Sequence, residues 1–262
     1  MANSLNTIMN IEVDIKNVSK SFDAHVVLNN VSLKVEESEN MVVFGQSGTG
    51  KSVLLKCMVG LLEPDSGEIF IEGTNVLKLK VKELNDIRKN IGFLFQGAAL
   101  YDSMSVRENL EFPLIRHFNF TPEEREERVK SVLEKVSLEE AIDKMPSELS
   151  GGMKKRIGLA RSIITEPRLM LYDEPTTGLD PITSKEISLL ILELQKSLKM
   201  TSIVVTHDLL CAEIIADRAI VLNEGIVQYE GTINELTSSR DPFLRNFFSH
   251  EIIEDQNRRS NV

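Results

Sequence analysis

Residues 45–52 read Gly45-Gln46-Ser47-Gly48-Thr49-Gly50-Lys51-Ser52, which fits the pattern G-x-x-x-x-G-K-[ST] in full. The apolar run Met41-Val42-Val43-Phe44 precedes this stretch and is short enough to be a buried strand. Apolar residues follow it at helical spacing, namely Val53, Leu54, Leu55, Met58 and Val59. The sequence therefore predicts a strand, a glycine-rich loop and a helix in succession, the arrangement that cradles a nucleoside triphosphate.

The residue types in this loop suit phosphate chemistry. Glycines let the backbone turn tightly, so that successive N–H groups and the positive end of the helix point at phosphate oxygens. Lys51 can reach the β and γ phosphates, and the hydroxyl of Ser52 can ligate Mg²⁺. An ordinary glycine-rich turn is the alternative, and the flanking strand and helix disfavour it. The loop predicts nucleotide binding.

Composition places the chain among soluble globular proteins. It has 262 residues, of which 42% are hydrophobic and 27% charged, and no apolar run approaches the 18 or more residues that span a bilayer. Met1 to Asn10 lack the features of a signal peptide, so we expect a cytoplasmic protein. The net charge of −10 argues against general nucleic-acid binding, but not against docking onto a membrane protein. Cys57 and Cys211 are expected to be buried free thiols.

The N-terminal region predicts antiparallel strands. Residues 11–36 alternate apolar and polar positions around the turn Asp23-Ala24-His25, which is typical of two strands in a half-exposed sheet. A further alternating segment follows at residues 68–73. Phe22 lies near the turn, where it either packs against its neighbours or offers a flat face to an adenine ring.

Residues from about 97 to 165 are expected to form an inserted helical subdomain. Thr121-Pro122-Glu123-Glu124 is a helix start, with Thr as N-cap and Pro at the first helical position. The charges from Glu123 to Lys130 indicate the solvated face of this helix. Its apolar positions follow an i, i+3, i+4, i+7 pattern, namely Val129, Val132, Leu133 and Val136.

Strands and helices alternate again after this insertion. The runs at 169–172, 202–206 and 218–222 predict buried strands, separated by helices at 182–198 and 209–216. This order predicts an α/β fold whose mainly parallel sheet is built by right-handed crossovers. We expect one domain over residues 1–240, then a C-terminal extension at 241–262 with a short helix and a mobile tail. The aromatic residues of that extension could pack on its own core or contact a partner subunit; they are Phe243, Phe247 and Phe248.

Polar side chains follow three predicted strands, at 169–172, at 202–206 and at the short apolar run Ile91-Gly92-Phe93-Leu94-Phe95. Asp173 and Glu174 come at the end of one strand, and in an open α/β sheet ligands bind beyond these carboxyl ends. Asp173 is then placed to hold Mg²⁺ through water, and Glu174 to polarise an attacking water. His207 ends a neighbouring strand, where it could hydrogen-bond a γ-phosphate or that water, and Gln96 could touch Mg²⁺ or water.

A second glycine-rich helix start lies at Leu149-Ser150-Gly151-Gly152-Met153. It is either an N-cap without a ligand or another phosphate-binding site. Both helix starts could serve one nucleotide only if the second came from another subunit, because two-fold pairing would place each opposite its partner's phosphate loop.

The ordered set of motifs resembles the nucleotide-binding subunit of ABC transporters over roughly residues 11–235. Gly45–Ser52 match Walker A, Gln96 the Q-loop, Leu149–Met153 the signature, Leu169–Glu174 Walker B, Gly178-Leu179-Asp180 the D-loop and His207 the switch histidine. The resemblance implies a P-loop NTPase fold, ATP, Mg²⁺ and a head-to-tail dimer that sandwiches two ATP molecules.

The resemblance also implies a role for each matching residue. Catalysis is assigned to Glu174, His207 and Gln96, and Mg²⁺ binding to Ser52, Gln96 and Asp173. ATP contacts are assigned to Phe22, Gly45, Gln46, Ser47, Gly48, Thr49, Gly50, Lys51, Ser52, Val53, Ser150, Gly151, Gly152 and Asp180.

One departure from the family pattern points to a particular class of ABC transporter. The commonest signature is LSGGQ, whereas this chain has Met153 in place of Gln, followed by Lys154-Lys155-Arg156. Together with residues 97–106 and Glu111-Phe112-Pro113-Leu114, this variant resembles the ATPase of Mla-type, MCE-associated lipid transporters. That resemblance implies a polytopic permease, an MCE-type substrate-binding protein, phospholipid cargo and a position at the cytoplasmic face of a bacterial inner membrane.

Other readings of the motifs are less consistent with the chain. An ABC ATPase for another cargo, such as an amino acid, an ion or a polysaccharide, is the nearest alternative. Non-transport ABC proteins usually carry two cassettes or a long coiled coil, and neither feature is found here. A regulatory module without turnover is disfavoured because Glu174 and His207 are both present.

Overall fold

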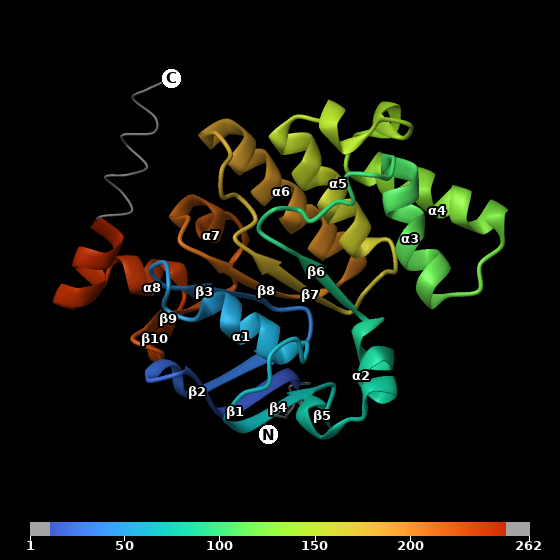
Figure 1. Cartoon of the computed structure of the whole chain (residues 1–262). Coiled ribbons are helices and arrows are strands. Elements are labelled where there is room, and N and C mark those ends of the chain that lie inside the picture. Colours follow the sequence, from blue (N-terminus) through green and yellow to red (C-terminus); the bar gives the residue numbers. More distant parts are fainter. Residues whose placement is uncertain (1–10, 250–262) are drawn as a thin grey trace, which may run out of the picture.

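The computed structural model describes residues 11–249, and its largest element is a six-stranded sheet (Figure 1). The strand order is β10-β9-β3-β8-β7-β6, and all neighbours are parallel except the β9–β10 pair. This confirms the predicted parallel α/β core. The strands are β3 (Asn40–Phe44), β6 (Ile91–Leu94), β7 (Leu169–Asp173), β8 (Thr201–Thr206), β9 (Arg218–Asn223) and β10 (Ile226–Gly231).

A second sheet is antiparallel and comes mainly from the N-terminal region. Its strand order is β2-β1-β4-β5, and Phe22 pairs with His25 across the turn that joins β1 to β2. The predicted strand pair over residues 11–36 is therefore confirmed. The strands are β1 (Ile11–Phe22), β2 (His25–Glu36), β4 (Ser66–Ile71) and β5 (Thr74–Asn75).

Helix α1 (Lys51–Met58) lies between the two sheets (Figure 1). Its buried Leu54, Leu55 and Met58 share one apolar cluster with residues of the antiparallel sheet and of β3, β7 and β8. Burial of each such side chain contributes roughly 1.5–3 kcal/mol. Gly50 opens the helix at φ 98°, and a Cβ there would lie 2.7 Å from the Val27 carbonyl oxygen, so only glycine fits. The helix that carries Lys51 is thus fixed from both sides.

The opposite face of the six-stranded sheet is covered by α5 (Gly151–Ile163), α6 (Pro181–Leu198) and α7 (Leu209–Ile215). Phe44 and Tyr172 are the largest fully buried side chains on this face. The two cysteines are buried and free, and burial raises the pKa of the Cys57 thiol to about 11 and that of Cys211 to about 12. Both thiols are therefore neutral packing groups at ordinary pH.

Between β6 and β7 the elements are all helical. They are α3 (Val106–His117), α4 (Pro122–Lys135), short 3-10 turns at Glu139–Ala141 and Pro146–Glu148, and α5. Helix α4 begins as predicted, since the Thr121 hydroxyl accepts a hydrogen bond from the Glu124 N–H. The remaining helices are α2 (Val81–Arg88), α8 (Ile233–Thr237) and a 3-10 turn at Val76–Lys78.

The C-terminal aromatic residues pack on the chain's own core. Residues 242–249 are helical, and the rings of Phe247 and Phe248 meet Phe44 edge-on at centroid distances of 6.3 and 5.5 Å. Phe243 stacks on Tyr229 at 5.7 Å. Of the two alternatives that the sequence left open, the structure thus shows packing in cis. The predicted mobile tail at 250–262 and the N-terminal Met1–Asn10 lie outside the described residues.

Within residues 11–249, each helix is too short or too polar to cross a membrane.

Phe248→Ala is predicted to destabilise the protein by about 3 kcal/mol, because the side chain is 2% exposed and its removal leaves a cavity behind Phe44. Urea denaturation followed by circular dichroism measures the loss. Phe243→Ala is the matched control, and its half-buried ring should cost about 1 kcal/mol. A Phe248→Ala variant as stable as the wild type would contradict the packing of this ring on Phe44.

Candidate functional site

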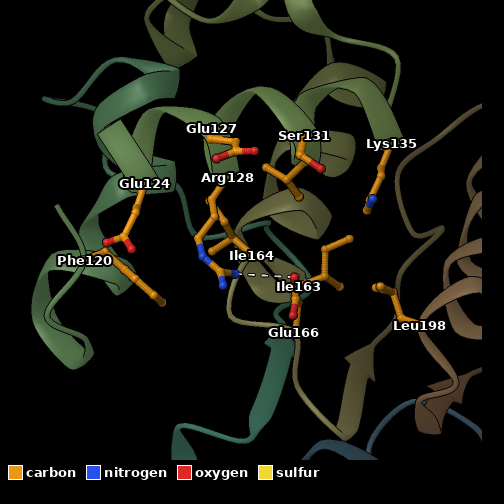
Figure 2. Close-up of a pocket in the computed structure, with 11 residues that line it drawn as sticks. Phe120, Glu124, Glu127, Arg128, Ser131, Lys135, Ile163, Ile164, Glu166 and Leu198 are labelled. Carbon is orange, nitrogen blue, oxygen red and sulfur yellow. Dashed lines mark hydrogen bonds and ion pairs between the residues drawn. The ribbon is translucent and has the colours of Figure 1, made fainter. Parts of the chain in front are cut away.

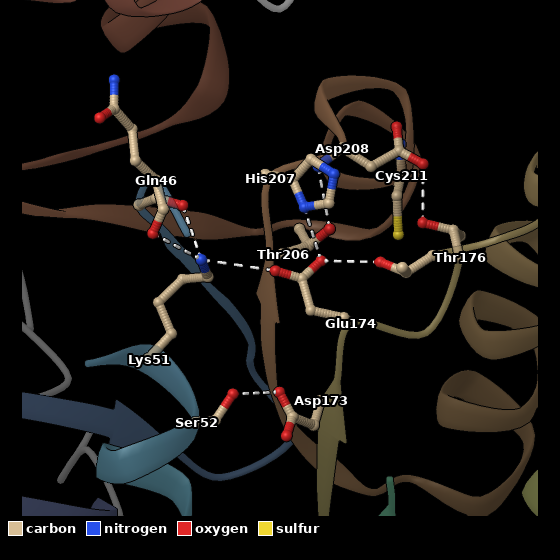
Figure 3. Close-up of polar contacts among 12 residues, drawn as sticks. Gln46, Lys51, Ser52, Asp173, Glu174, Thr176, Thr206, His207, Asp208 and Cys211 are labelled. Atoms are coloured by element: carbon tan, nitrogen blue, oxygen red, sulfur yellow. Dashed lines mark hydrogen bonds and ion pairs between the residues drawn. The ribbon is translucent and has the colours of Figure 1, made fainter. Parts of the chain in front are cut away.

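The side chain of Lys51 lies inside the glycine-rich loop (Figure 3). It is 6% exposed, and its Nζ donates hydrogen bonds to the carbonyl oxygens of Gly45 (2.6 Å) and Gln46 (3.2 Å). The same Nζ lies 3.4 Å from Oε1 of Glu174. Thr49 closes the loop by donating from its hydroxyl to the Gln46 carbonyl at 2.8 Å. A buried ammonium group is therefore held at the point where the loop turns into α1.

Ser52 and Asp173 form the next contact toward β7. The Ser52 hydroxyl donates to Oδ1 of Asp173 at 2.7 Å, and Asp173 is the last residue of β7. A hydroxyl and a carboxylate are the hard oxygen ligands that Mg²⁺ prefers, and Mg²⁺ commonly takes only one or two protein ligands beside substrate phosphates. In the part of the chain that the structure describes, no cluster of three or more His, Cys, Asp or Glu side chains could hold a metal alone. The pair fits an ion that arrives with a nucleotide.

Glu174 is the most constrained carboxylate of this network. Its backbone is left-handed (φ 50°), and its side chain is 11% exposed. Oε2 lies 2.8 Å from Nδ1 of His207 and accepts a hydrogen bond from the Thr177 hydroxyl at 3.3 Å. Burial favours the neutral carboxyl, but the contact with His207 and the charge of Lys51 outweigh it, so the pKa of Glu174 lies below its ordinary value. The group is an oriented carboxylate.

A second contact joins the loops that follow β7 and β8. Asp208 accepts a hydrogen bond from the Thr176 hydroxyl at 2.7 Å, and its other oxygen caps α7 by accepting from the Cys211 N–H. Thr176 is 4% exposed, so this bond is shielded from water on one side. Sequence reasoning missed the pair. It fixes the loop of Glu174 relative to the loop of His207.

Other predicted site residues lie outside this network. Among the contacts of residues 11–249, the exposed side chain of Gln96 does not reach Ser52 or Asp173, and its carbonyl oxygen instead accepts a hydrogen bond from Lys155. Phe22 is 43% exposed at the end of β1. Val53 lies in the first turn of α1.

The first residues of α5 and α6 also lie outside the network around Lys51. Ser150 caps α5 by accepting from the Met153 N–H at 3.2 Å, and Gly151 and Gly152 form its first turn. Asp180 caps α6, and hydrogen bonds from Thr183 hold the pKa of its carboxyl below the ordinary value. Ser150, Gly151 and Asp180 are exposed at these two helix starts.

A pocket of about 400 Å³ lies far from these residues, between α4 and the ends of α5 and α6 (Figure 2). Arg128 crosses it, with the guanidinium carbon 4.4 Å from the centre of the Phe120 ring and NH1 3.4 Å from the Glu166 carboxylate. The pocket shares no residue with the network around Lys51.

Residues 28–177 match the family described as ABC transporter. The chain belongs to the ABC transporter ATPases. It is 38% identical to the intermembrane phospholipid transport system ATP-binding protein MlaF of Haemophilus influenzae, over 91% of this chain and 90% of that one. It is 40% identical to the chloroplastic protein TRIGALACTOSYLDIACYLGLYCEROL 3 of Arabidopsis thaliana, over 90% of this chain and 72% of that one.

Solved structures agree with this membership. The dimeric post-hydrolysis state of the ATP-binding cassette MJ0796, bound to ADP and Pi, matches with a TM-score of 0.78 and 34% identity, over 84% of this chain and 98% of that one. CbiO1 of Clostridium perfringens matches with a TM-score of 0.80 and 28% identity, over 95% of each chain. This chain is therefore an ABC ATPase that binds and hydrolyses ATP.

Thr176→Val is predicted to lower the free energy of unfolding by about 1.5–3 kcal/mol, because it removes a hydrogen bond to a carboxylate while keeping the shape of the side chain. Chemical denaturation measures the loss. Thr183→Val removes the same kind of bond at the exposed Asp180 and should cause a much smaller change. If Thr176→Val is as stable as the wild type, the contact does not hold the two loops.

Proposed function

We propose that this ABC ATPase powers lipid trafficking between bacterial envelope membranes, from the cytoplasmic face of the inner membrane. The observation that carries the proposal is the 38% identity to a phospholipid transport ATPase over nine-tenths of both chains. A second relative of similar identity is also named for a lipid.

Other relatives carry names for other cargo. A Mycobacterium leprae protein, mkl, is named for ribonucleotide transport and is 37% identical, over 70% of its own length. A methionine import protein, MetN of Carboxydothermus hydrogenoformans, is 39% identical over 62% of its length. Lipid is favoured because the likeness to MlaF extends over most of the relative's length and Met153 matches the Mla-type signature.

The geometry supports a division of labour among the site residues. The ammonium group of Lys51 already donates hydrogen bonds to the carbonyl oxygens of Gly45 and Gln46. A phosphate oxygen can take the place of these carbonyls as the acceptor. Ser52 and Asp173 would hold Mg²⁺, which when bound supplies charge neutralisation between the β and γ phosphates. Gln96 would join them from the neighbouring strand end after its loop moves.

Glu174 is the proposed general base. Its carboxylate is ionised, and His207 and Thr177 fix the direction of Oε2. Phosphoryl transfer needs little covalent help from the protein, so orientation of the attacking water is the main contribution that a carboxylate can make. His207 would then also contact the γ-phosphate.

The proposed assembly is a head-to-tail homodimer. Ser150 and Gly151 are exposed and Gly152 is half-buried, and in such a dimer they would face the partner's phosphate loop together with Asp180. Phe22 would stack on the adenine ring. The dimeric cassette MJ0796 supports this arrangement for the fold. Further proposed partners are a polytopic permease and an MCE-type substrate-binding protein, with no nucleic acid.

ATP would favour the closed dimer and hydrolysis would reopen it, so that the permease alternates between two states. Glu174→Gln is predicted to lower kcat by about 10²–10⁴-fold while the protein still binds ATP and accumulates as an ATP-bound dimer. Phosphate release and size-exclusion chromatography with Mg²⁺ measure both effects. Lys51→Ala is the control and should lose binding of a fluorescent ATP analogue. Hydrolysis at the wild-type rate in Glu174→Gln would remove Glu174 from its proposed role.

The lipid assignment predicts that the chain, purified in mild detergent from the cell that makes it, brings down a permease and an MCE-type protein with bound phospholipid. Mass spectrometry of the partner chains and of the extracted lipid measures this. Lys51→Ala is again the control, since it should copurify with the same partners although it cannot bind ATP. Copurification with an amino-acid or nucleotide importer instead would replace lipid by that cargo.

A further inference from the structure

Lys155 is a buried lysine that connects α5 to the ends of two core strands. It lies in the second turn of α5 and is 5% exposed. Its Nζ donates hydrogen bonds to the carbonyl oxygens of Gln96 (2.5 Å) and Glu174 (3.2 Å). Gln96 comes two positions after Leu94, the last residue of β6, and Glu174 comes directly after β7. One ammonium group therefore binds the backbone at two of the three predicted catalytic positions.

The charge of Lys155 is costly where it lies. Burial lowers the pKa of its amine, and the negative charges of Glu174 and Asp173 only partly offset this. An apolar side chain of similar length would avoid that cost, but it would leave the carbonyl oxygens of Gln96 and Glu174 without this donor. Packing alone therefore gives no reason for a lysine here.

The backbone of Glu174 gives such a reason. Its left-handed conformation (φ 50°) is one that residues with a Cβ rarely adopt, so neighbouring groups must hold it. The Glu174 N–H donates to the Val205 carbonyl of β8 at 2.9 Å, and the Glu174 carbonyl accepts from Lys155. The peptide groups on either side of the carboxylate are thus fixed by β8 and by α5.

Helix α5 makes a second hydrogen bond to the segment that follows Gln96. Arg161 donates from its guanidinium to the Ala98 carbonyl at 3.0 Å and contacts the Asn109 side chain at 3.3 Å. Ala98 is also left-handed, at φ 60°. The turn that carries Gln96 is therefore bound to α5 at two points, and among the hydrogen bonds of residues 11–249 Lys155 also joins α5 to Glu174.

We propose that Lys155 is a positioning residue for ATP hydrolysis, which sets the backbone of Glu174 and Gln96 according to the placement of α5. This inference rests on the role proposed for Glu174 as general base. Because Ser150–Gly152 at the start of α5 would face the other nucleotide of a dimer, the same lysine links the two half-sites that one subunit contributes.

The test compares Lys155→Met, Lys155→Arg and the wild type in the full-length protein, with ATP and Mg²⁺. Lys155→Met should lower kcat by about 10- to 100-fold, because a small displacement of the base is enough for a loss of that size. The KM for ATP should change little, and kcat is measured well below the thermal midpoint, which the loss of two hydrogen bonds lowers. Lys155→Arg keeps a donor and should recover part of the lost kcat. Lys130→Met removes an exposed positive charge on α4 and should match the wild type.

Three outcomes would overturn the proposal. They are a wild-type kcat in Lys155→Met, a fall in kcat that only follows a lower thermal midpoint, and no recovery in Lys155→Arg. If Lys155→Met does not fold, Lys155→Gln replaces it, because its shorter amide can donate to one of the two carbonyls but not to both. It should lose part of kcat at an unchanged KM, and a normal kcat there counts against the proposal. The two proposals fail separately. Activity in Glu174→Gln refutes the base, whereas an inactive Glu174→Gln beside a fully active Lys155→Met refutes only the positioning role.

Discussion

Parallel pairing of β3, β8 and β7 is the constraint that brings the catalytic groups together. Phe44 pairs with Thr206 and Asp173 with Val205, so the chain leaves all three strands at the same edge of the sheet. Lys51, Glu174 and His207 follow these ends and meet within hydrogen-bonding or ion-pair distance. A shift in the register of β7 would carry Glu174 away from Lys51 and His207, so the chemistry depends on backbone pairing made deep in the core.

The sequence predicted those features that depend on local pattern. The loop at 45–52, the helix start at Thr121 and the buried strands are each determined by neighbouring residues, and carboxyl ends of parallel strands share an edge in any such sheet. Asp173, Glu174 and His207 could therefore be placed together before any coordinates were known. Whether Phe243 and Phe247 pack on their own chain depends on distant partners, Tyr229 and Phe44. The local sequence pattern around these residues does not show such partners.

Lys155 and Thr176 escaped sequence reasoning for different reasons. Lys155 stands in the run Lys154-Lys155-Arg156, which reads as a solvated face, although helical spacing puts it in line with Leu159 and Ile163, both buried. Thr176 has a common residue type in a loop, and its partner Asp208 lies 32 positions away. Contacts of this kind depend on how the strand ends are arranged in space.

The order of strands in the sheet also bears on how the protein is made. Strand β3 is made early in synthesis, yet its neighbours β8 and β9 come from residues 201–223, and the rings of Phe247 and Phe248 pack on Phe44. Pairing of such distant segments makes folding slow, because the long loop must be closed before its contacts form. A partly synthesised chain would therefore leave the nucleotide loop without its flanking strands until residues 201–223 have been made and have paired with β3.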